Sequence, residues 1–367
     1  MDFQLSDDQR ALRSGMRDLL GAAFDRDRLR AAVERHGALD RSLWRELGAA
    51  GFFALRLPEE AGGVGLGLPE AVLLFEEAGR ALLPGPLVAT HLAAGLVKGA
   101  AEGEAVVTAV AGELPVAHLA EADAVLVAGA EPPAGEATGA EALTGEALRA
   151  FVAAARPVRS MDPLTPLHRA PAGRVSATEG FRVASERTRA DAERAPAATE
   201  CTPAHAGRFR IEAALLTAAE QLGSAARTTE AAVQHAGSRE QFGSPVGAFQ
   251  AVKHLCADML ARTEPARAAV YAAAVTGDPV EIAAAKLLAD EAAVRNARDC
   301  LQIHGGMGFT WEADVHLHLK RAWLRAASWL TGAGAEELLA ADLGAAGLLP
   351  RSSAAYGRPV PEAGGGG

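Results

Sequence analysis

The chain has 367 residues, a length that allows two or three domains at roughly 100–200 residues each. Its 46 acidic residues outnumber its 36 basic ones, and the net charge of −10 excludes a general attraction to nucleic acid or to anionic membranes. Hydrophobic residues make up 49% of the chain and charged residues 22%, as in folded proteins and unlike disordered ones.

The cysteines and the apolar stretches give an expectation about location. Cys201, Cys256 and Cys300 are far apart and form no C-x-x-C pair, which favours a reducing compartment. The first ten residues are charged where a signal peptide needs an apolar core, and prolines interrupt the most apolar stretch, residues 81–97. We therefore expect a cytoplasmic protein without a membrane partner.

The first hundred residues have the pattern of amphipathic helices. Ser6 and Gln9 have the spacing of a capping box, and apolar residues then recur at helical spacing as far as Leu20. Further helices are expected over residues 42–51 and 69–83, where Pro84 and the residues after it stop the pattern. We assign residues 1–102 to an N-terminal helical domain.

The middle of the chain has the pattern of short strands. Residues 105–111 and 123–128 are β-branched runs bounded by Gly, Pro and acidic residues, and residues 156–183 contain weaker runs between prolines. Residues 130–155 show little periodicity. We assign residues 103–190 to a small β domain.

The C-terminal part is again helical. Long Ala-rich helices joined by short loops predict an antiparallel four-helix bundle within residues 191–346, and the Pro, Ser and Gly content of residues 347–367 predicts a disordered tail. The expected fold class is therefore mainly α, with a small middle β domain. The expected helices of the bundle cover residues 208–237, 249–276, 279–304 and 314–330.

Two glycine-containing segments interrupt these helices with polar side chains that a bundle core does not need. In the first, Arg239 offers a planar fork suited to a phosphate, and Phe242 can lie against a ring system. In the second, Gly305 and Gly306 let the backbone approach a ligand closely. Each segment alone is also compatible with an ordinary turn at the end of a helix.

Together, in this order and about 60 residues apart, the two segments resemble the acyl-CoA dehydrogenase family, flavoenzymes of lipid metabolism that desaturate acyl thioesters. The resemblance covers nearly the whole chain and implies the family's fold. The motifs that carry it are Arg239-x-x-Phe242-Gly243 with Gln250, Gln302-x-x-Gly305-Gly306, Glu46-Leu-Gly-Ala-Ala-Gly-Phe and Pro58-Glu-Glu-Ala-Gly-Gly-Val-Gly-Leu.

The resemblance also implies roles for these residues. In the family, the flavin ring of FAD lies in the middle and C-terminal domains of one subunit, and the neighbouring subunit clasps the pyrophosphate and adenosine. By this resemblance Arg239 would pair with the pyrophosphate, and Phe242 and Gln250 would contact the adenosine half. The other side of the site would be closed by Gln302, Gly305 and Gly306.

The family's catalytic base is missing from its expected positions. Family members usually carry a Glu some two dozen residues after the Gly-Gly turn, where this chain has Trp329. A second family solution places the Glu on the preceding long helix, where the ungapped position is Ala213. Glu212 is one residue away and about 100° round the helix, so an ordinary surface carboxylate is the favoured interpretation of this candidate.

Four further residues near the end of the bundle receive structural interpretations. His316 and His318 are two apart and diverge on a helix, so no metal site is expected. Arg321 and Arg325 are interpreted as solvated charges.

The middle domain also lacks recognisable forms of the family's flavin-binding motifs.

The chain thus has the adenosine-side clasp and lacks the base. We expect an FAD-dependent acyl-CoA dehydrogenase-type subunit that acts on an acyl-CoA or acyl-carrier thioester and completes a flavin site in a second such subunit. The family's heterotetramers, some of them bacterial enzymes of sterol side-chain degradation, work in this way. The alternatives are a self-sufficient homo-oligomeric dehydrogenase with an unidentified base, and a flavin-free structural or binding relative.

Overall fold

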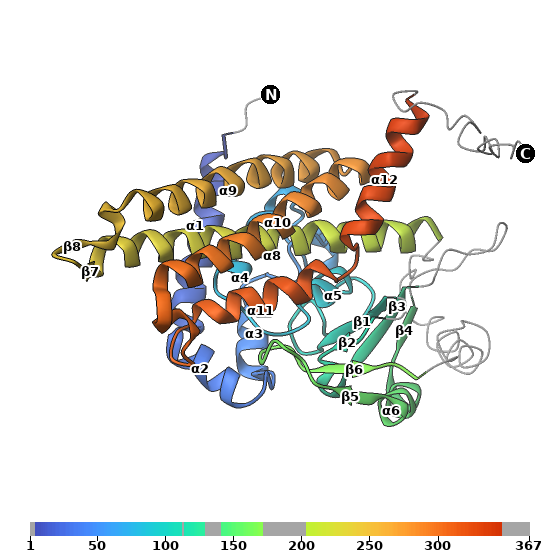
Figure 1. The fold of residues 1–367 in the computed structure, drawn as a ribbon. Helices are drawn as coiled ribbons and strands as arrows, with labels where there is room; N and C mark the ends of the chain where they lie inside the picture. Colours follow the sequence, from blue (N-terminus) through green and yellow to red (C-terminus); the bar gives the residue numbers. More distant parts are fainter. Residues whose placement is uncertain (1–3, 112–113, 129–140, 172–202, 347–367) are drawn as a thin grey trace, which may run out of the picture.

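The computed structural model of the chain describes residues 4–111, 114–128, 141–171 and 203–346. Long C-terminal helices form the spine of the molecule, and the N-terminal helices and the strands lie along one side of it (Figure 1). This is the predicted mainly α fold. Cys201, residues 112–113, 129–140 and 172–190 of the predicted β domain, and the predicted disordered tail lie outside the described residues.

The spine consists of α8 to α11 and confirms the predicted bundle. Alanine and leucine side chains fill its interior. Asp278 caps the third helix by accepting hydrogen bonds from the backbone N–H groups of Val280 and Glu281. The helices are α8 (Pro203–Ser238), α9 (Gln250–Thr276), α10 (Pro279–His304) and α11 (Val315–Ala326).

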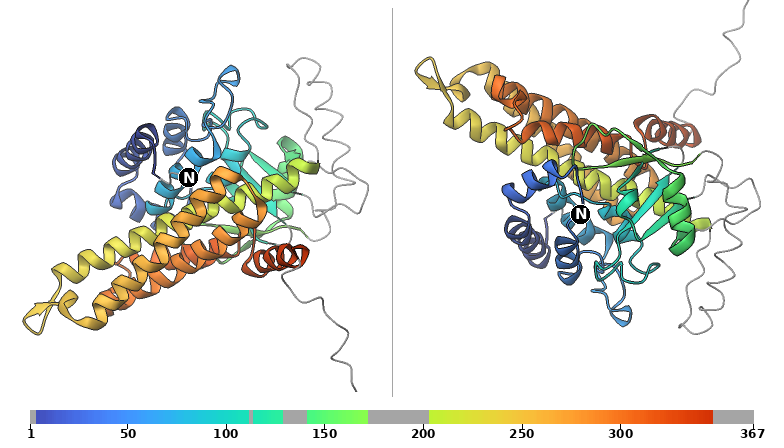
Figure 2. Two further views of the ribbon diagram at one scale, coloured as in Figure 1. Left: turned by 90° about the horizontal axis from the view of Figure 1, so that it is seen from above. Right: turned by 90° about the horizontal axis from the view of Figure 1, so that it is seen from below.

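A further helix that the sequence pattern did not predict, α12 (Gly332–Ala345), follows the bundle. Thr331 caps it by accepting a hydrogen bond from the N–H of Gly334. Both views in Figure 2 place this helix near the small sheets and far from the hairpin at the other end of the bundle.

The N-terminal helices confirm the predicted capping box of Ser6 and Gln9. Two short helices were not predicted, because one is rich in Arg and the other directly follows Pro86. The helices are α1 (Asp7–Ala23), α2 (Arg26–Glu34), α3 (Arg41–Ala49), α4 (Leu68–Arg80) and α5 (Leu87–Leu92).

Helix α4 crosses α8 at very short range. A Cβ atom at Gly79 would lie 2.0 Å from the carbonyl oxygen of Glu220, and one at Gly223 would lie 1.9 Å from the carbonyl oxygen of Glu76. The two backbones can approach this closely only because both positions are glycine. The crossing buries the side chains of both glutamates.

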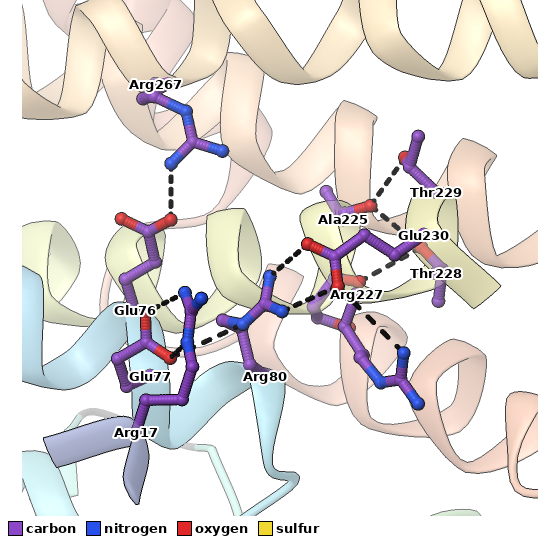
Figure 3. Close-up of polar contacts among 11 residues, drawn as sticks. Arg17, Glu76, Glu77, Arg80, Ala225, Arg227, Thr228, Thr229, Glu230 and Arg267 are labelled. Atoms are coloured by element: carbon purple, nitrogen blue, oxygen red, sulfur yellow. Dashed lines mark hydrogen bonds and ion pairs between the residues drawn. The ribbon is translucent and has the colours of Figure 1, made fainter. Parts of the chain in front are cut away.

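Ion pairs surround this crossing and tie α4 to its neighbours (Figure 3). The buried carboxylate of Glu76 accepts hydrogen bonds from Arg267 of α9 and from the hydroxyl of Tyr271, the latter at 2.6 Å. Glu77 pairs with Arg17 of α1 at 2.6 Å. Arg80 pairs with Glu230 of α8 at 2.6 Å and with Glu77 at 3.4 Å.

The strands form two small three-stranded sheets beside the bundle. One contains β1 (Val107–Ala111), β3 (Ala124–Ala128) and β4 (Glu141–Leu143), with β1 and β3 parallel. The other is antiparallel and contains β2 (Val116–Ala117), β6 (Leu167–Arg169) and β5 (Arg156–Val158). Strands were predicted at the positions of β1, β3, β5 and β6, but not at those of β2 and β4.

The stretch of little periodicity, residues 130–155, ends in a helix that was not predicted, α6 (Gly145–Ala154). Only Leu148 and Phe151 are buried in this helix, and its other positions are largely Ala, so the apolar pattern is weak. The predicted domain boundaries at residues 102 and 190 stay predictions.

Candidate functional site

A short β-hairpin with a two-residue turn projects from the end of the bundle between α8 and α9. Its strands are β7 (Glu240–Gln241) and β8 (Ser244–Pro245), and Phe242 and Gly243 form the turn with φ angles of 53° and 77°. Two positive φ angles are typical of a type I′ turn, in which glycine is common and phenylalanine is strained. The Phe242 side chain is 92% exposed and meets the ring of Phe249 edge-on with 6.2 Å between centroids, so packing within this chain compensates little for the strain.

Arg239 lies at the base of this hairpin. Its N–H donates to the carbonyl oxygen of His235 at 2.9 Å, and its own carbonyl accepts from the N–H of Val246 at 2.7 Å. The backbone is therefore fixed. The guanidinium is exposed and makes no hydrogen bond or ion pair within the described parts of the chain.

The second predicted segment lies at the same end of the bundle. Helix α10 ends at His304, and Gly305 then has a φ of 60° and a ψ of −143°, a conformation that suits glycine. The ring of His304 stacks on the ring of His235 with 4.1 Å between centroids, so the two segments lie side by side. The other predicted clasp residues, Gln250, Gln302, Gly305 and Gly306, are all exposed.

A second site, which we call the inner cavity, lies where the small sheets meet the bundle and is partly open to solvent. It is a cavity of about 140 Å³. Trp329, the residue at the expected position of the family's base, forms part of its wall and stacks edge-on against Phe209 at 5.7 Å. Polar groups in the wall come from Thr108, His118, Thr165, Thr217, Glu220, Arg321, Arg325 and Ser328.

The interpretation of Arg321 and Arg325 as solvated charges is wrong. Both are buried, with 4% and 6% of their surface exposed. Arg321 donates to the carboxylate of Asp162 and, at 3.1 Å, to the carbonyl oxygen of Leu83. Arg325 donates to Glu220 at 2.6 Å. Burial lowers the pKa of Arg325 to about 10, so it stays charged at neutral pH.

Glu220 is a cavity residue that the sequence pattern did not single out. Burial raises the pKa of its carboxyl, and this effect outweighs the opposing charges of Arg325 and Arg321. Its position is two helical turns after Ala213, the ungapped position of the family's alternative base. That spacing puts Glu220 on the same helix face as Ala213, a signal that could have identified it.

Glu212, the base candidate from the sequence, lies elsewhere. It is not among the residues that line the cavity. Its carboxylate pairs with Arg56 and Arg208, each at 2.7 Å. Burial would raise its pKa, but the hydrogen bonds and charges of the two arginines outweigh burial and lower it. A carboxylate held in this way is a poor base.

A larger, open cleft of about 720 Å³ separates the N-terminal helices from the outer part of the bundle. Arg17, Glu77 and Arg80 line it, and Figure 3 shows them already engaged in ion pairs. His318 also lines it, but its side chain is buried and its Nδ1 lies 2.8 Å from the hydroxyl of Ser224. His316 instead stacks on Trp311 with 4.9 Å between centroids.

Comparison with known proteins supports the predicted family. Residues 6–102 match the model of the acyl-CoA dehydrogenase N-terminal domain, and residues 208–348 match that of the acyl-CoA dehydrogenase C-terminal domain. The chain is 35% identical to the acyl-CoA dehydrogenase IpdE2 of Mycobacterium tuberculosis over 300 residues, which are 80% of this chain and 84% of that protein.

Two further relatives extend this comparison. The chain is 35% identical to the acyl-CoA dehydrogenase FadE34 of Mycobacterium tuberculosis over 86% of its own length, and it spans 46% of that longer protein. Its fold is similar to a chain of the ChsE4–ChsE5 complex from Mycobacterium tuberculosis, with a TM-score of 0.73 and 22% identity over 96% of this chain and 100% of that one.

The bundle, the helical N-terminal part and the small sheets between them define an acyl-CoA dehydrogenase-like fold. The chain belongs to the acyl-CoA dehydrogenase family of oxidoreductases. The predicted family, fold class and enzyme class are thus confirmed. Within the described ranges, no helix is both long and apolar enough to cross a membrane.

Proposed function

We propose that this chain is a subunit of an FAD-dependent acyl-CoA dehydrogenase and contributes the adenosine-side half of a flavin site to an unlike subunit in the cytoplasm. The observation that carries the proposal is an asymmetry between two sites. The exposed end of the bundle presents the complete clasp motif, whereas the inner cavity is small and has Trp329 where the base is expected.

The end of the bundle fits a bound diphosphate. Arg239 holds a free guanidinium on a fixed backbone, which suits charge-assisted hydrogen bonds to phosphate oxygens. Phe242 presents an exposed ring that can pack on the adenosine half. Both side chains point away from their own subunit's core and therefore need a neighbour that supplies the rest of the FAD site.

The inner cavity does not fit a flavin ring and an acyl chain. Ligand pockets for molecules of that size are about 300–1,000 Å³, whereas this cavity is about 140 Å³. Its wall also contains the ion pair between Glu220 and Arg325. FAD, when bound, accepts the hydride from the acyl β-carbon, and an indole cannot remove the α-proton near neutral pH.

One observation favours a second candidate function, the self-sufficient dehydrogenase. Glu220 is a carboxylate with a raised pKa in the same cavity wall as Trp329, as expected of a buried general base. For this role the cavity would have to enlarge, and Glu220 would have to leave Arg325. We therefore keep the half-site as the proposal.

The test is acyl-CoA oxidation by the chain alone and by the chain co-expressed with a family member that carries the Glu base. With FAD, an acyl-CoA and an artificial electron acceptor, we expect little turnover from the lone chain and restored turnover from the pair. Glu264→Gln, at an exposed carboxylate on α9, serves as the control. Turnover by the lone chain that Glu220→Gln abolishes and Glu264→Gln does not would establish the second candidate instead.

A further inference from the structure

Two stacked imidazole rings connect the two segments of the clasp. His235 lies one helical turn before Arg239, and its carbonyl oxygen accepts the hydrogen bond from the N–H of Arg239. His304 is the last residue of α10 and directly precedes Gly305. The two rings lie 4.1 Å apart between centroids with 22° between their planes, so the imidazole pair bridges the segments.

The imidazole pair has basic nitrogens that solvent can reach. Nδ1 of His304 lies 2.8 Å from the carbonyl oxygen of Cys300, so Nδ1 carries hydrogen and Nε2 is the atom that accepts a proton. This Nε2 and the ring nitrogens of His235 have no hydrogen-bond partner among the described residues. Both residues are half-buried, and their unpaired nitrogens keep accessible surface in the large open cleft.

The charges that act on the imidazole pair are positive. Burial lowers the pKa of His235 below the ordinary 6.5, and the charges of His304 and Arg239 lower it further. Two protonated rings at this separation would also repel each other, so the pair holds at most about one proton near neutral pH.

The other charges of the cleft are largely matched with one another. Arg17 and Arg80 pair with Glu77, and Arg26 pairs with Asp314. None of these ion pairs includes the imidazole pair, which therefore has no carboxylate partner within the described ranges. The remaining charged or titratable groups that line the cleft are Asp25, Arg227, Glu312 and His318.

We propose that the imidazole pair is the proton-linked part of the clasp: one of its rings takes up a proton from solvent as the diphosphate of FAD binds beside Arg239. An anion raises the pKa of a nearby imidazole, and by the same coupling the protonated pair binds the anion more tightly. The second ring stays neutral and keeps the stack. This inference rests on the proposed function and adds its regulation by pH.

The experiment is calorimetric titration with FAD of the assembled enzyme, stripped of flavin, at pH 8, 7 and 6, each in two buffers of different ionisation enthalpy. The affinity for FAD should rise about threefold to tenfold from pH 8 to pH 6, with uptake of up to about one proton per FAD. FAD binding without proton uptake would overturn this inference and leave the proposed function intact. Absence of FAD binding at every pH would overturn both.

Variants assign the proton to the imidazole pair. His235→Phe with His304→Phe keeps two aromatic rings but removes the titratable nitrogens, so FAD should bind without proton uptake. His168→Phe, at a half-buried histidine of β6 in the small sheets, is the control and should keep the uptake. Uptake as in the wild type by the double variant would show that the pair is only a structural stack.

A measurement on the free chain needs neither FAD nor the double variant. His304→Phe alone removes the charge that opposes protonation of His235, so the pKa of His235 should rise toward 6.5 in an NMR titration of its ring protons. His168→Phe should leave that pKa unchanged. An equal pKa of His235 in wild type and His304→Phe would show that the two rings do not share a proton.

Discussion

Phe242 and Gly243 share one tight turn, and both have positive φ angles, 53° and 77°. Only the glycine adopts such an angle without strain, and the phenylalanine ring is nearly fully exposed. A bulky residue kept in an unfavourable conformation with little packing suggests a binding role.

Phe242→Asn should therefore stabilise the free chain and weaken FAD binding by the assembled enzyme. Asn tolerates the left-handed conformation, so we expect the free energy of unfolding to rise by about 0.5–1 kcal/mol in urea titrations. Phe309→Asn is the control, because Phe309 is also exposed but does not have a positive φ and so has no such strain to relieve. The idea fails if the two variants change stability equally.

Arg239→Ala should lower the FAD occupancy of the assembled enzyme at limiting FAD by roughly tenfold or more, since a charge-assisted hydrogen bond contributes about 1.5–3 kcal/mol. Its side chain has no partner within the described chain, so the urea midpoint should not change. Arg149→Ala removes a comparable exposed arginine from α6 and should leave the flavin content unchanged. Equal absorbance at the flavin bands in Arg239→Ala and wild type would contradict the assigned role.

Glu76→Gln should destabilise the chain strongly. Glu76 is 2% exposed and holds both Arg267 and Tyr271, so its neutralisation leaves a largely buried guanidinium with only the longer contact to the exposed Glu264, at 3.5 Å, at a cost of about 3 kcal/mol. Tyr271→Phe removes one hydrogen bond and should cost less. Glu230→Gln, at a carboxylate with 53% side-chain exposure, should cost under about 1 kcal/mol. A smaller loss of unfolding free energy in Glu76→Gln than in Tyr271→Phe or Glu230→Gln, measured by urea unfolding, would refute the stabilising role assigned to Glu76.

Buried neutral histidines should make the chain less stable in acid. Burial lowers the pKa of His91 to about 4 and that of His318 to about 3, from an ordinary value of 6.5. As pH falls below 6.5, the unfolded chain binds protons that the native chain does not, so the free energy of unfolding decreases. Each histidine contributes a slope approaching about 1.4 kcal/mol per pH unit near pH 5.

The pH dependence can be measured by urea unfolding between pH 7 and pH 4. His91→Gln should reduce the slope by the contribution of one proton, whereas His254→Gln, at an exposed position of α9, should not change it. An unchanged slope in His91→Gln would mean that His91 is already protonated in the folded chain at these pH values.

Local patterns in the sequence determined most of the helices and identified candidate residues of the clasp, whose role stays a prediction. The long helices of the bundle are predictable because alanine has a high helix propensity and because Pro, Gly and capping residues mark where these Ala-rich stretches begin and end. The clasp is predictable because Arg239 to Gln250 and Gln302 to Gly306 are contiguous motifs. The helices that were missed, α2, α5, α6 and α12, are short or lack a clear apolar stripe.

The inner cavity was decided only by the tertiary structure. Whether Arg321 and Arg325 are solvated or buried depends on Asp162 and Glu220, which are more than 100 residues away in the sequence. The position of Glu220 depends in turn on the close crossing of α8 with α4, where Gly79 meets its carbonyl oxygen. Burial and charge pairing are properties of contacts between distant segments, so a local pattern gives a residue's type and helix face but not the environment that sets its charge and role.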